Sequence, residues 1–173
     1  LYQKVTEIVK RYAWKLDVSD GFLLATPQRQ LSSCMYAAVK SWQNKQEQFE
    51  NEQAYEDLGV EEVEVNSAPL MAEIFNQIAS TLDFDELYKN DSKFNMLLSL
   101  LKDFFKQHPD EKIIMFSYFR GTIRYLAERL KQAGFDNEIL MGGMKEAKQS
   151  IIDRFKSESS KSILIASEVA SEG

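Results

Sequence analysis

The second half of the chain alternates between two apolar patterns, and this alternation restricts the possible folds more than any other feature of the sequence. Apolar residues at three- and four-residue spacing predict amphipathic helices. Between these stretches, short apolar runs predict strands near residues 112–117, 138–141 and 162–167. A chain that repeats helix and strand in this way is expected to form a parallel sheet with crossover helices.

The first 90 residues carry only the helical pattern. Apolar residues recur on one helix face from Val5 to Leu16, within residues 28–55, and again after Ser67. The change of pattern near residue 90 predicts two parts, a helical region of residues 1–90 and an α/β region of residues 91–173. The chain stops a few residues after its third expected strand, so we expect it to be a piece of a longer protein.

The composition excludes several classes of protein. The hydrophobic fraction of 44% is enough for a folded core. The single cysteine, Cys34, rules out an intramolecular disulfide, and no apolar run approaches the roughly 20 residues of a membrane span. A cytoplasmic protein is therefore expected. Trp14 and Trp42 are expected to be packing residues rather than platforms for nucleic-acid bases.

The net charge of −6 is concentrated in one segment. Residues 50–90 carry eleven acidic side chains and one basic one, whereas residues 1–49 and 91–173 are slightly basic. The total charge therefore does not exclude a nucleic-acid partner for either flank. The acidic segment 50–66 is expected to be a solvated loop; the alternative is a regulatory segment that imitates nucleic acid on a basic groove.

Small and polar residues follow each expected strand. They are Ser117-Tyr118-Phe119-Arg120, then Gly142-Gly143, then Ser167 to Gly173. Ligands of open parallel sheets bind outside the carboxyl ends of the strands. Backbone amides at a helix start and the Arg120 guanidinium suit a phosphate group; the alternative is that these are ordinary turns.

Four strings of residues in order resemble a known family. Lys112 to Phe119 resembles motif four of superfamily two helicases, and Ile163 to Gly173 resembles the front half of motif five. Ala170-Ser171-Glu172-Gly173 and the stretches Leu1–Thr6 and Gln28–Ser33 are similar to Swi/Snf-type ATPases. The fold class that the resemblance implies is α/β, a truncated RecA-like parallel three-layer lobe preceded by a helical N-terminal region. The acidic stretch near residues 44–66 has no counterpart in this resemblance.

The resemblance implies a role in an ATP-dependent DNA translocase, with ATP and Mg²⁺ as cofactors of the full-length parent. The implied partners are double-stranded DNA, the missing first RecA-like lobe and a protein complex, with no membrane. The implied location is the cytoplasm of a bacterial-type cell, in association with the nucleoid. Ser117, Tyr118, Arg120 and Ser167 are the implied nucleic-acid contacts. Glu172 and Gly173 are implied to couple the DNA side to the nucleotide side.

The sequence departs from the family in ways that limit these implications. Lys148 stands where the usual pattern has an arginine seven residues before Phe155, and no phosphate-binding Gly-x-x-x-x-Gly-Lys-[Ser/Thr] string occurs. We therefore expect no catalytic or metal site in these 173 residues, no tight nucleotide binding and no ATP hydrolysis by them alone. Two alternatives stay open: a freestanding α/β protein-interaction module, and a lobe of an RNA helicase.

Overall fold

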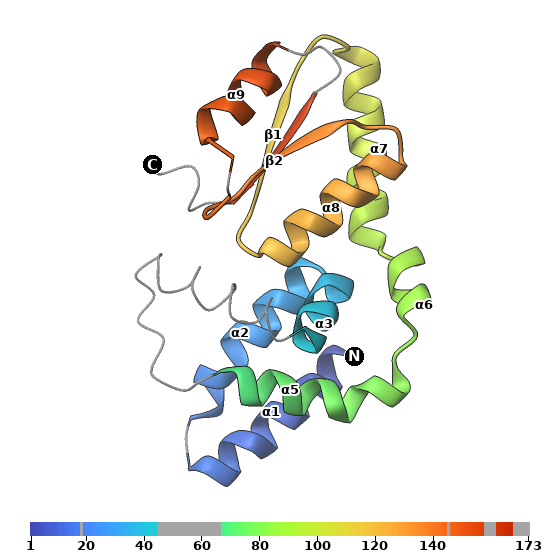
Figure 1. The fold of residues 1–173 in the computed structure, drawn as a ribbon. Helices are drawn as coiled ribbons and strands as arrows, with labels where there is room; N and C mark the ends of the chain where they lie inside the picture. Colours follow the sequence, from blue (N-terminus) through green and yellow to red (C-terminus); the bar gives the residue numbers. More distant parts are fainter. Residues whose placement is uncertain (18, 45–66, 145, 158–161, 168–173) are drawn as a thin grey trace. The chain divides into compact units, whose positions relative to one another are not determined.

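The computed structural model describes residues 1–17, 19–44, 67–144, 146–157 and 162–167 (Figure 1). The chain forms two compact units, Leu1–Asn90 and Asp91–Gly173.

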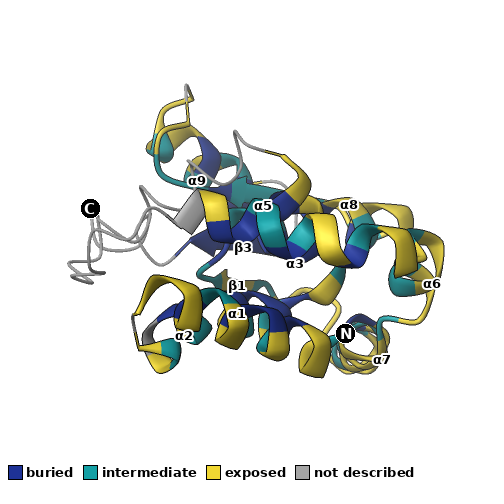
Figure 2. Ribbon diagram, turned by 90° about the horizontal axis from the view of Figure 1, so that it is seen from below, coloured by how far each residue is buried: buried dark blue, intermediate teal, exposed yellow. Residues whose placement is uncertain are grey.

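The first unit is helical throughout its described part. Its elements are α1 (Tyr2–Leu16), α2 (Asp20–Ser33), α3 (Met35–Gln43), α5 (Ser67–Ile78), the 3-10 helix η1 (Ala79–Thr81) and α6 (Phe84–Lys89). The inward faces share one hydrophobic core, in which Ile8, Trp42 and Ile74 are at most 2% exposed. The outer faces of the helices are exposed (Figure 2). This is the amphipathic arrangement that the spacing of apolar residues predicts.

The expectation of one helix over residues 28–55 is wrong, because the helix is interrupted at Cys34. Cys34 is in the extended conformation, with φ of −160°, and lies between α2 and α3. Its sulfur accepts a hydrogen bond from the Ala37 amide at 3.4 Å, so the thiol caps α3 as a serine or aspartate side chain would. Because Cys34 is apolar and also caps α3, the helical spacing of apolar residues continues across the interruption and does not reveal it. Residues 45–55 lie outside the described part of the chain.

The two tryptophans have opposite environments. Trp42 packs as expected: it is 2% exposed, and its indole Nε1 donates to Gln30 Oε1 at 2.5 Å. The same expectation is wrong for Trp14, which is 86% exposed. Trp14 follows the buried Val5 by nine residues, which at 3.6 residues per turn places it on the opposite face of α1.

The second unit alternates helix and strand. Its elements are α7 (Ser92–Gln107), β1 (Ile113–Ser117), α8 (Arg120–Gln132), β2 (Asn137–Leu140), α9 (Lys148–Ser157) and β3 (Ile163–Ser167). The strands form one parallel sheet in the order β1-β3-β2. The expectation of three parallel strands with crossover helices is therefore confirmed.

Helices cover both faces of the sheet (Figure 1). Ile151 and Phe155 of α9 form a core with Leu140, Leu164 and Ala166 of the strands. Because side chains alternate along a strand, Ile163 and Ile165 point to the other face. Both are fully buried, and α8 contacts all three strands.

Local signals fix where α7 and α8 begin and end. Asp91 caps α7 by accepting a hydrogen bond from the Phe94 amide at 2.9 Å, and α7 ends at Gln107, before His108-Pro109, as the sequence suggests. Gly134 follows the C-cap of α8 with φ of +87°. The amides of Gly134 and Phe135 donate back to the carbonyls of Lys131 and Leu130, which is the Schellman pattern.

Candidate nucleic-acid interface

The carboxyl ends of the three strands meet at one edge of the sheet. Ser117 ends β1 and Ser167 ends β3, and the two serines are register partners in the parallel ladder. Register partners on neighbouring strands lie side by side and point to the same face. The two strand ends, 50 residues apart in the sequence, thus form one polar position.

The hydroxyl of Ser167 has an unusual environment. Ser167 is 4% exposed, and its Oγ has no hydrogen-bond partner among the described residues. A buried hydroxyl without a partner costs about 1–3 kcal/mol. Ser117, beside it, is half-buried. The sheet edge therefore holds a polar group whose hydrogen-bonding capacity the described protein does not use.

Helix α8 begins directly at this edge. Only Tyr118 and Phe119 separate Ser117 from its first residue, Arg120, and the N-cap Phe119 makes no side-chain cap. The first amides of any helix lack a carbonyl partner one turn earlier, and they carry the positive end of the helix dipole. An anion at the two serines would therefore lie near a helix N-terminus, which favours negative charge.

Arg120 joins two of the strand ends. Its Nη2 donates to the carbonyl oxygen of Gly142, just after β2, at 2.9 Å. The backbone at Gly143 has φ of +70°, and a Cβ added there would lie 3.8 Å from Arg120 Nη2. The guanidinium thus braces the turn after β2. A guanidinium has five N–H donors, and the bond to Gly142 uses one of them.

Of the aromatic pair between β1 and α8, Tyr118 and Phe119, one residue packs in the core, as expected. Phe119 is 7% exposed and packs in the core. Tyr118 contacts it edge-on, with ring centroids 5.2 Å apart. Tyr118 is half-buried, and its hydroxyl oxygen is buried.

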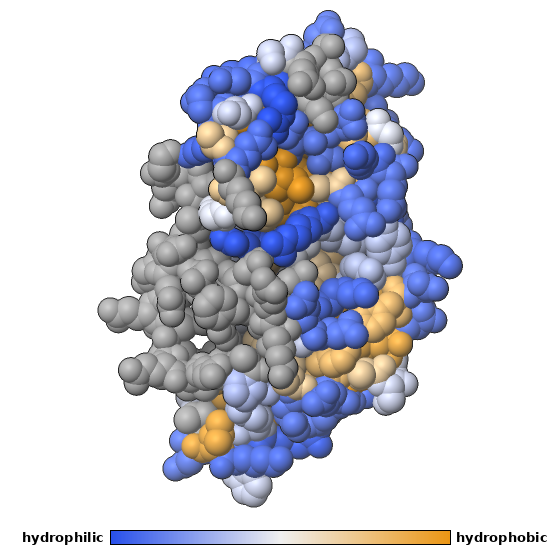
Figure 3. Space-filling model, viewed as in Figure 1, coloured by the Kyte–Doolittle hydropathy of each residue, from blue (hydrophilic) through white to orange (hydrophobic). Residues whose placement is uncertain are grey.

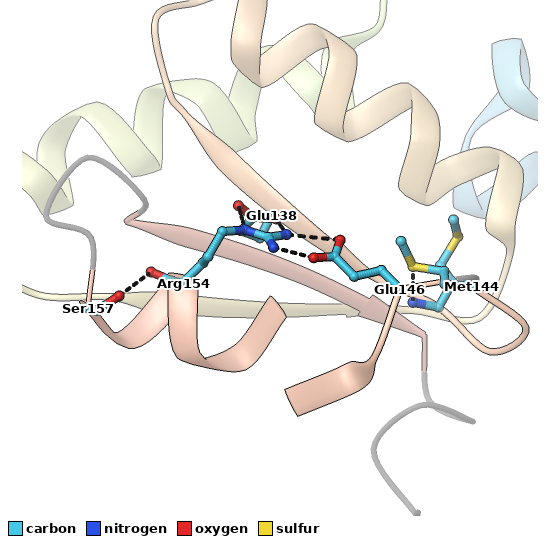
Figure 4. A network of polar contacts seen from close by, with 6 residues as sticks. Glu138, Met144, Glu146, Arg154 and Ser157 are labelled. Carbon is cyan, nitrogen blue, oxygen red and sulfur yellow. Dashed lines mark hydrogen bonds and ion pairs between the residues drawn. The ribbon is translucent and has the colours of Figure 1, made fainter. Parts of the chain in front are cut away.

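A network of charged residues lies beside the segment that follows β2 (Figure 4). Arg154 of α9 donates from Nε and Nη2 to Glu138 of β2, at 3.1 and 3.0 Å. It also binds Glu146, which precedes α9, through Nη1 and through Nη2 at 3.1 Å. The hydrogen bond from Arg154 holds the pKa of Glu146 below its ordinary value, and the two carboxylates raise the pKa of Arg154.

Sequence reasoning missed this network. Its members are 8 and 16 residues apart, not the three or four residues at which side chains on one helix meet. The available signal was weak: an arginine at the end of one amphipathic helix and a glutamate just before its start.

Other expected features are only partly described. Lys148, at the position where the family pattern has arginine, is the first residue of α9 and is half-buried. Glu172 and Gly173 lie outside the described residues, as does the acidic segment 50–66. Among the residues that the structure describes, no group of three or more His, Cys, Asp or Glu side chains could hold a metal ion. Within the same residues, no helix is long and apolar enough to cross a membrane.

An apolar groove lies on the α9 face of the sheet. Ile114 and Phe116 of the edge strand β1 are 52% and 56% exposed there. The groove continues to Ile152 and Phe155 of α9. Hydrophobic surface is also visible beside α9 in the space-filling view (Figure 3).

Comparison with known proteins agrees with this architecture. Residues 92–173 match the family model of the helicase conserved C-terminal domain. No curated protein matches the chain. The match covers every helix and strand that the structure describes in the second unit, from α7 to β3. The family match and the parallel sheet support a helicase-like C-terminal lobe of superfamily two in residues 92–173.

Proposed function

We propose that this lobe belongs to an ATP-dependent DNA translocase of the Swi/Snf type, and that its sheet edge contacts the phosphate backbone of DNA. The observation that carries the proposal is the pairing of Ser117 with Ser167 beside the N-terminus of α8. Each supplies a hydroxyl at the edge where ligands of parallel sheets bind.

The chemistry of this edge suits a phosphate better than a base. Hydroxyls and backbone amides donate hydrogen bonds to phosphate oxygens without regard to sequence. A motor that moves along DNA must accept every sequence, so contacts of this kind fit its task. In this proposal, the half-buried Tyr118 adds an aromatic side chain next to the serines, and stacking on an aromatic ring tolerates any base.

The finer assignment to Swi/Snf-type proteins rests on resemblance. The stretches Leu1–Thr6 and Gln28–Ser33, and the string Ala170–Gly173, are similar to that group. In the parent, ATP and Mg²⁺ would supply the phosphoryl-transfer chemistry in the presence of the first lobe. The serine pair would contribute phosphate contacts, and Glu172 and Gly173 would contribute coupling between the DNA and nucleotide sides.

Binding of labelled nucleic acid to the 173-residue chain tests the proposal. Fluorescence anisotropy with double-stranded DNA and double-stranded RNA, at several salt concentrations, gives the affinity and its salt slope. We expect tighter binding to DNA. Ser117→Ala should weaken binding at an unchanged salt slope, because no charge is lost.

Arg120→Ala distinguishes two roles of the arginine. If Arg120 binds phosphate, the variant lowers the salt slope by about one unit. If Arg120 only braces Gly142, binding weakens at an unchanged slope. Ser99→Ala, an exposed serine of α7, and Lys131→Ala, at the other end of α8, are the matched controls. Wild-type binding by Ser117→Ala together with Arg120→Ala would contradict the proposed interface.

A protein-interaction module is the second candidate, and the apolar groove favours it. Half-exposed Ile114 and Phe116 on an edge strand are typical of a surface that another element covers. Phe116→Ser separates the two functions. Nucleic-acid binding should survive this substitution, because Phe116 and Ser117 point to opposite faces of the sheet.

A further inference from the structure

The segment between β2 and α9 is fastened at both ends. We call its described residues, 141–144 and 146–147, the β2–α9 loop. At the β2 end, Arg120 donates to the carbonyl of Gly142. At the α9 end, Glu146 binds Arg154. Inside the loop, the Met141 amide donates to the sulfur of Met144 at 3.2 Å.

The contacts at the α9 end require the shape of a guanidinium. Arg154 holds Glu138 through two parallel hydrogen bonds and binds Glu146 through two more. A lysine ammonium has the same charge but not this planar fork. Glu138 lies on β2 and is 13% exposed at its side chain, so the fork ties the loop to the sheet itself.

The charges of the network make it a poor ligand for phosphate. Two carboxylates surround one guanidinium, which leaves a net negative charge. Near a nucleic-acid interface, this charge repels the phosphate backbone. A direct electrostatic contribution to binding is therefore unfavourable, and any favourable contribution must come from the conformation that the network holds.

We propose that Arg154 is a positioning residue: by clasping Glu138 and Glu146 it holds the β2–α9 loop in the conformation in which the loop flanks Ser167 at the sheet edge. This inference rests on the proposed function, which places phosphate at that edge. Residue Met141 follows Leu140, the register partner of Ala166, so the loop begins level with Ser167. A loop fixed before binding loses less conformational entropy on contact with a ligand.

The two contributions of Glu146 have opposite signs, and this makes the inference testable. Glu146→Gln removes a negative charge, which by electrostatics alone strengthens nucleic-acid binding. It also loosens the clasp, which by positioning weakens binding. Asp153→Asn is the matched control, since it removes the same charge from an exposed position one residue before Arg154. The Asp153 carboxylate accepts a hydrogen bond from Gln149 of the same helix, at 2.7 Å.

Hydrogen exchange of the 173-residue chain measures the loop directly. In Glu146→Gln and Arg154→Lys, amides of the β2–α9 loop should exchange about two- to fivefold faster than in the wild type, the range expected for a partly exposed ion pair. Amides of β3 and α8 should keep their protection. Asp153→Asn should match the wild type throughout. Unchanged loop exchange in both Glu146→Gln and Arg154→Lys would overturn the inference.

Anisotropy with labelled double-stranded DNA then supplies the second measurement. We expect Glu146→Gln to bind about two- to fivefold more weakly, in line with the loosened loop, and Asp153→Asn to bind equally or more tightly. Tighter binding by both variants would overturn the positioning role. A wild-type chain that binds no DNA would refute the proposed function instead, and the exchange measurement would still decide whether Arg154 fixes the loop.

Discussion

Ser167 combines two properties that seldom occur together in a residue kept only for stability. It is buried at the end of the central strand, and its hydroxyl has no partner among the described residues. Alanine at this position would remove an unsatisfied polar group and leave the packing of the strand nearly unchanged. A phosphate at the proposed interface would supply the hydrogen-bond partner that this hydroxyl lacks.

Ser167→Ala should therefore stabilise the second unit while weakening nucleic-acid binding. We expect the free energy of unfolding of that unit to rise by up to about 1 kcal/mol, the size of the relieved desolvation penalty. Ser41→Ala is the contrasting variant. Ser41 is equally buried, but its hydroxyl donates to the Ala38 carbonyl at 2.7 Å, so its loss should destabilise the first unit by about 1 kcal/mol.

Urea unfolding followed by hydrogen exchange of β3 measures the first variant, and unfolding followed by tryptophan fluorescence measures the second. A loss of stability in Ser167→Ala would show that the hydroxyl is satisfied in solution. In that case, its proposed role at the interface would lose its energetic support.

The sequence was sufficient to find the serines but not the arginine contacts. Ser117 and Ser167 follow apolar runs, and the rule on strand ends brings them to one edge on the strength of that pattern alone. Arg120 donates to a carbonyl 22 residues away along the chain, and Arg154 binds carboxylates that are 16 and 8 residues away. Such contacts depend on the conformation of the chain after β2, which the spacing of apolar residues in the sequence does not indicate.

Among the helices and strands, Gly134 shows how a single residue ends an element. Its φ of +87° is costly for any residue with a Cβ. No atom lies within 4 Å of a Cβ built there, so a side chain would meet backbone strain without a clash. The Schellman hydrogen bonds that follow depend on this conformation.

Gly134→Ala should thus destabilise the second unit by about 1–2 kcal/mol, the cost of the left-handed conformation for an L-residue. Gly21→Ala is the control in helix α2, where the φ angle is not positive and the added Cβ has only Ser19 Oγ nearby, at 3.9 Å. It should stabilise the first unit by about 0.5–1 kcal/mol. Thermal unfolding, followed by hydrogen exchange of β3 and by tryptophan fluorescence, measures both effects. An equal loss of stability in the two variants would contradict the role given to Gly134.

The strands could be predicted almost to the residue, whereas their order could not. Apolar runs expected at 112–117 and 162–167 are observed at Ile113–Ser117 and Ile163–Ser167. Placing β3 between β1 and β2 depends on tertiary packing, which periodicity does not contain. The helix expected across Cys34 was wrong for a related reason, since its capping bond to Ala37 is a matter of side-chain geometry.

Across the chain as a whole, each unit has a hydrophobic core of its own. The core of the first unit is built from residues between Val5 and Ile78, and a core of the second is built from residues between Leu140 and Ala166. Both tryptophans, Trp14 and Trp42, belong to the first unit. Because Trp14 is 86% exposed, Trp14→Phe leaves the buried Trp42 as a fluorescent reporter of that unit alone.

We expect the two units to unfold in separate transitions, because chains with more than one core depart from two-state behaviour. In the Trp14→Phe background, Trp42 fluorescence in urea reports the first unit, and hydrogen exchange of β3 reports the second. Ile165→Ala removes a fully buried side chain of β3 and should lower the β3 midpoint, at a cost of about 2–5 kcal/mol. The Trp42 midpoint should not change. Ile74→Ala, equally buried in the first unit, should produce the reverse pattern. If either substitution moved both midpoints together, the two cores would form one cooperative unit, and the helical region would have to be regarded as an integral part of the lobe.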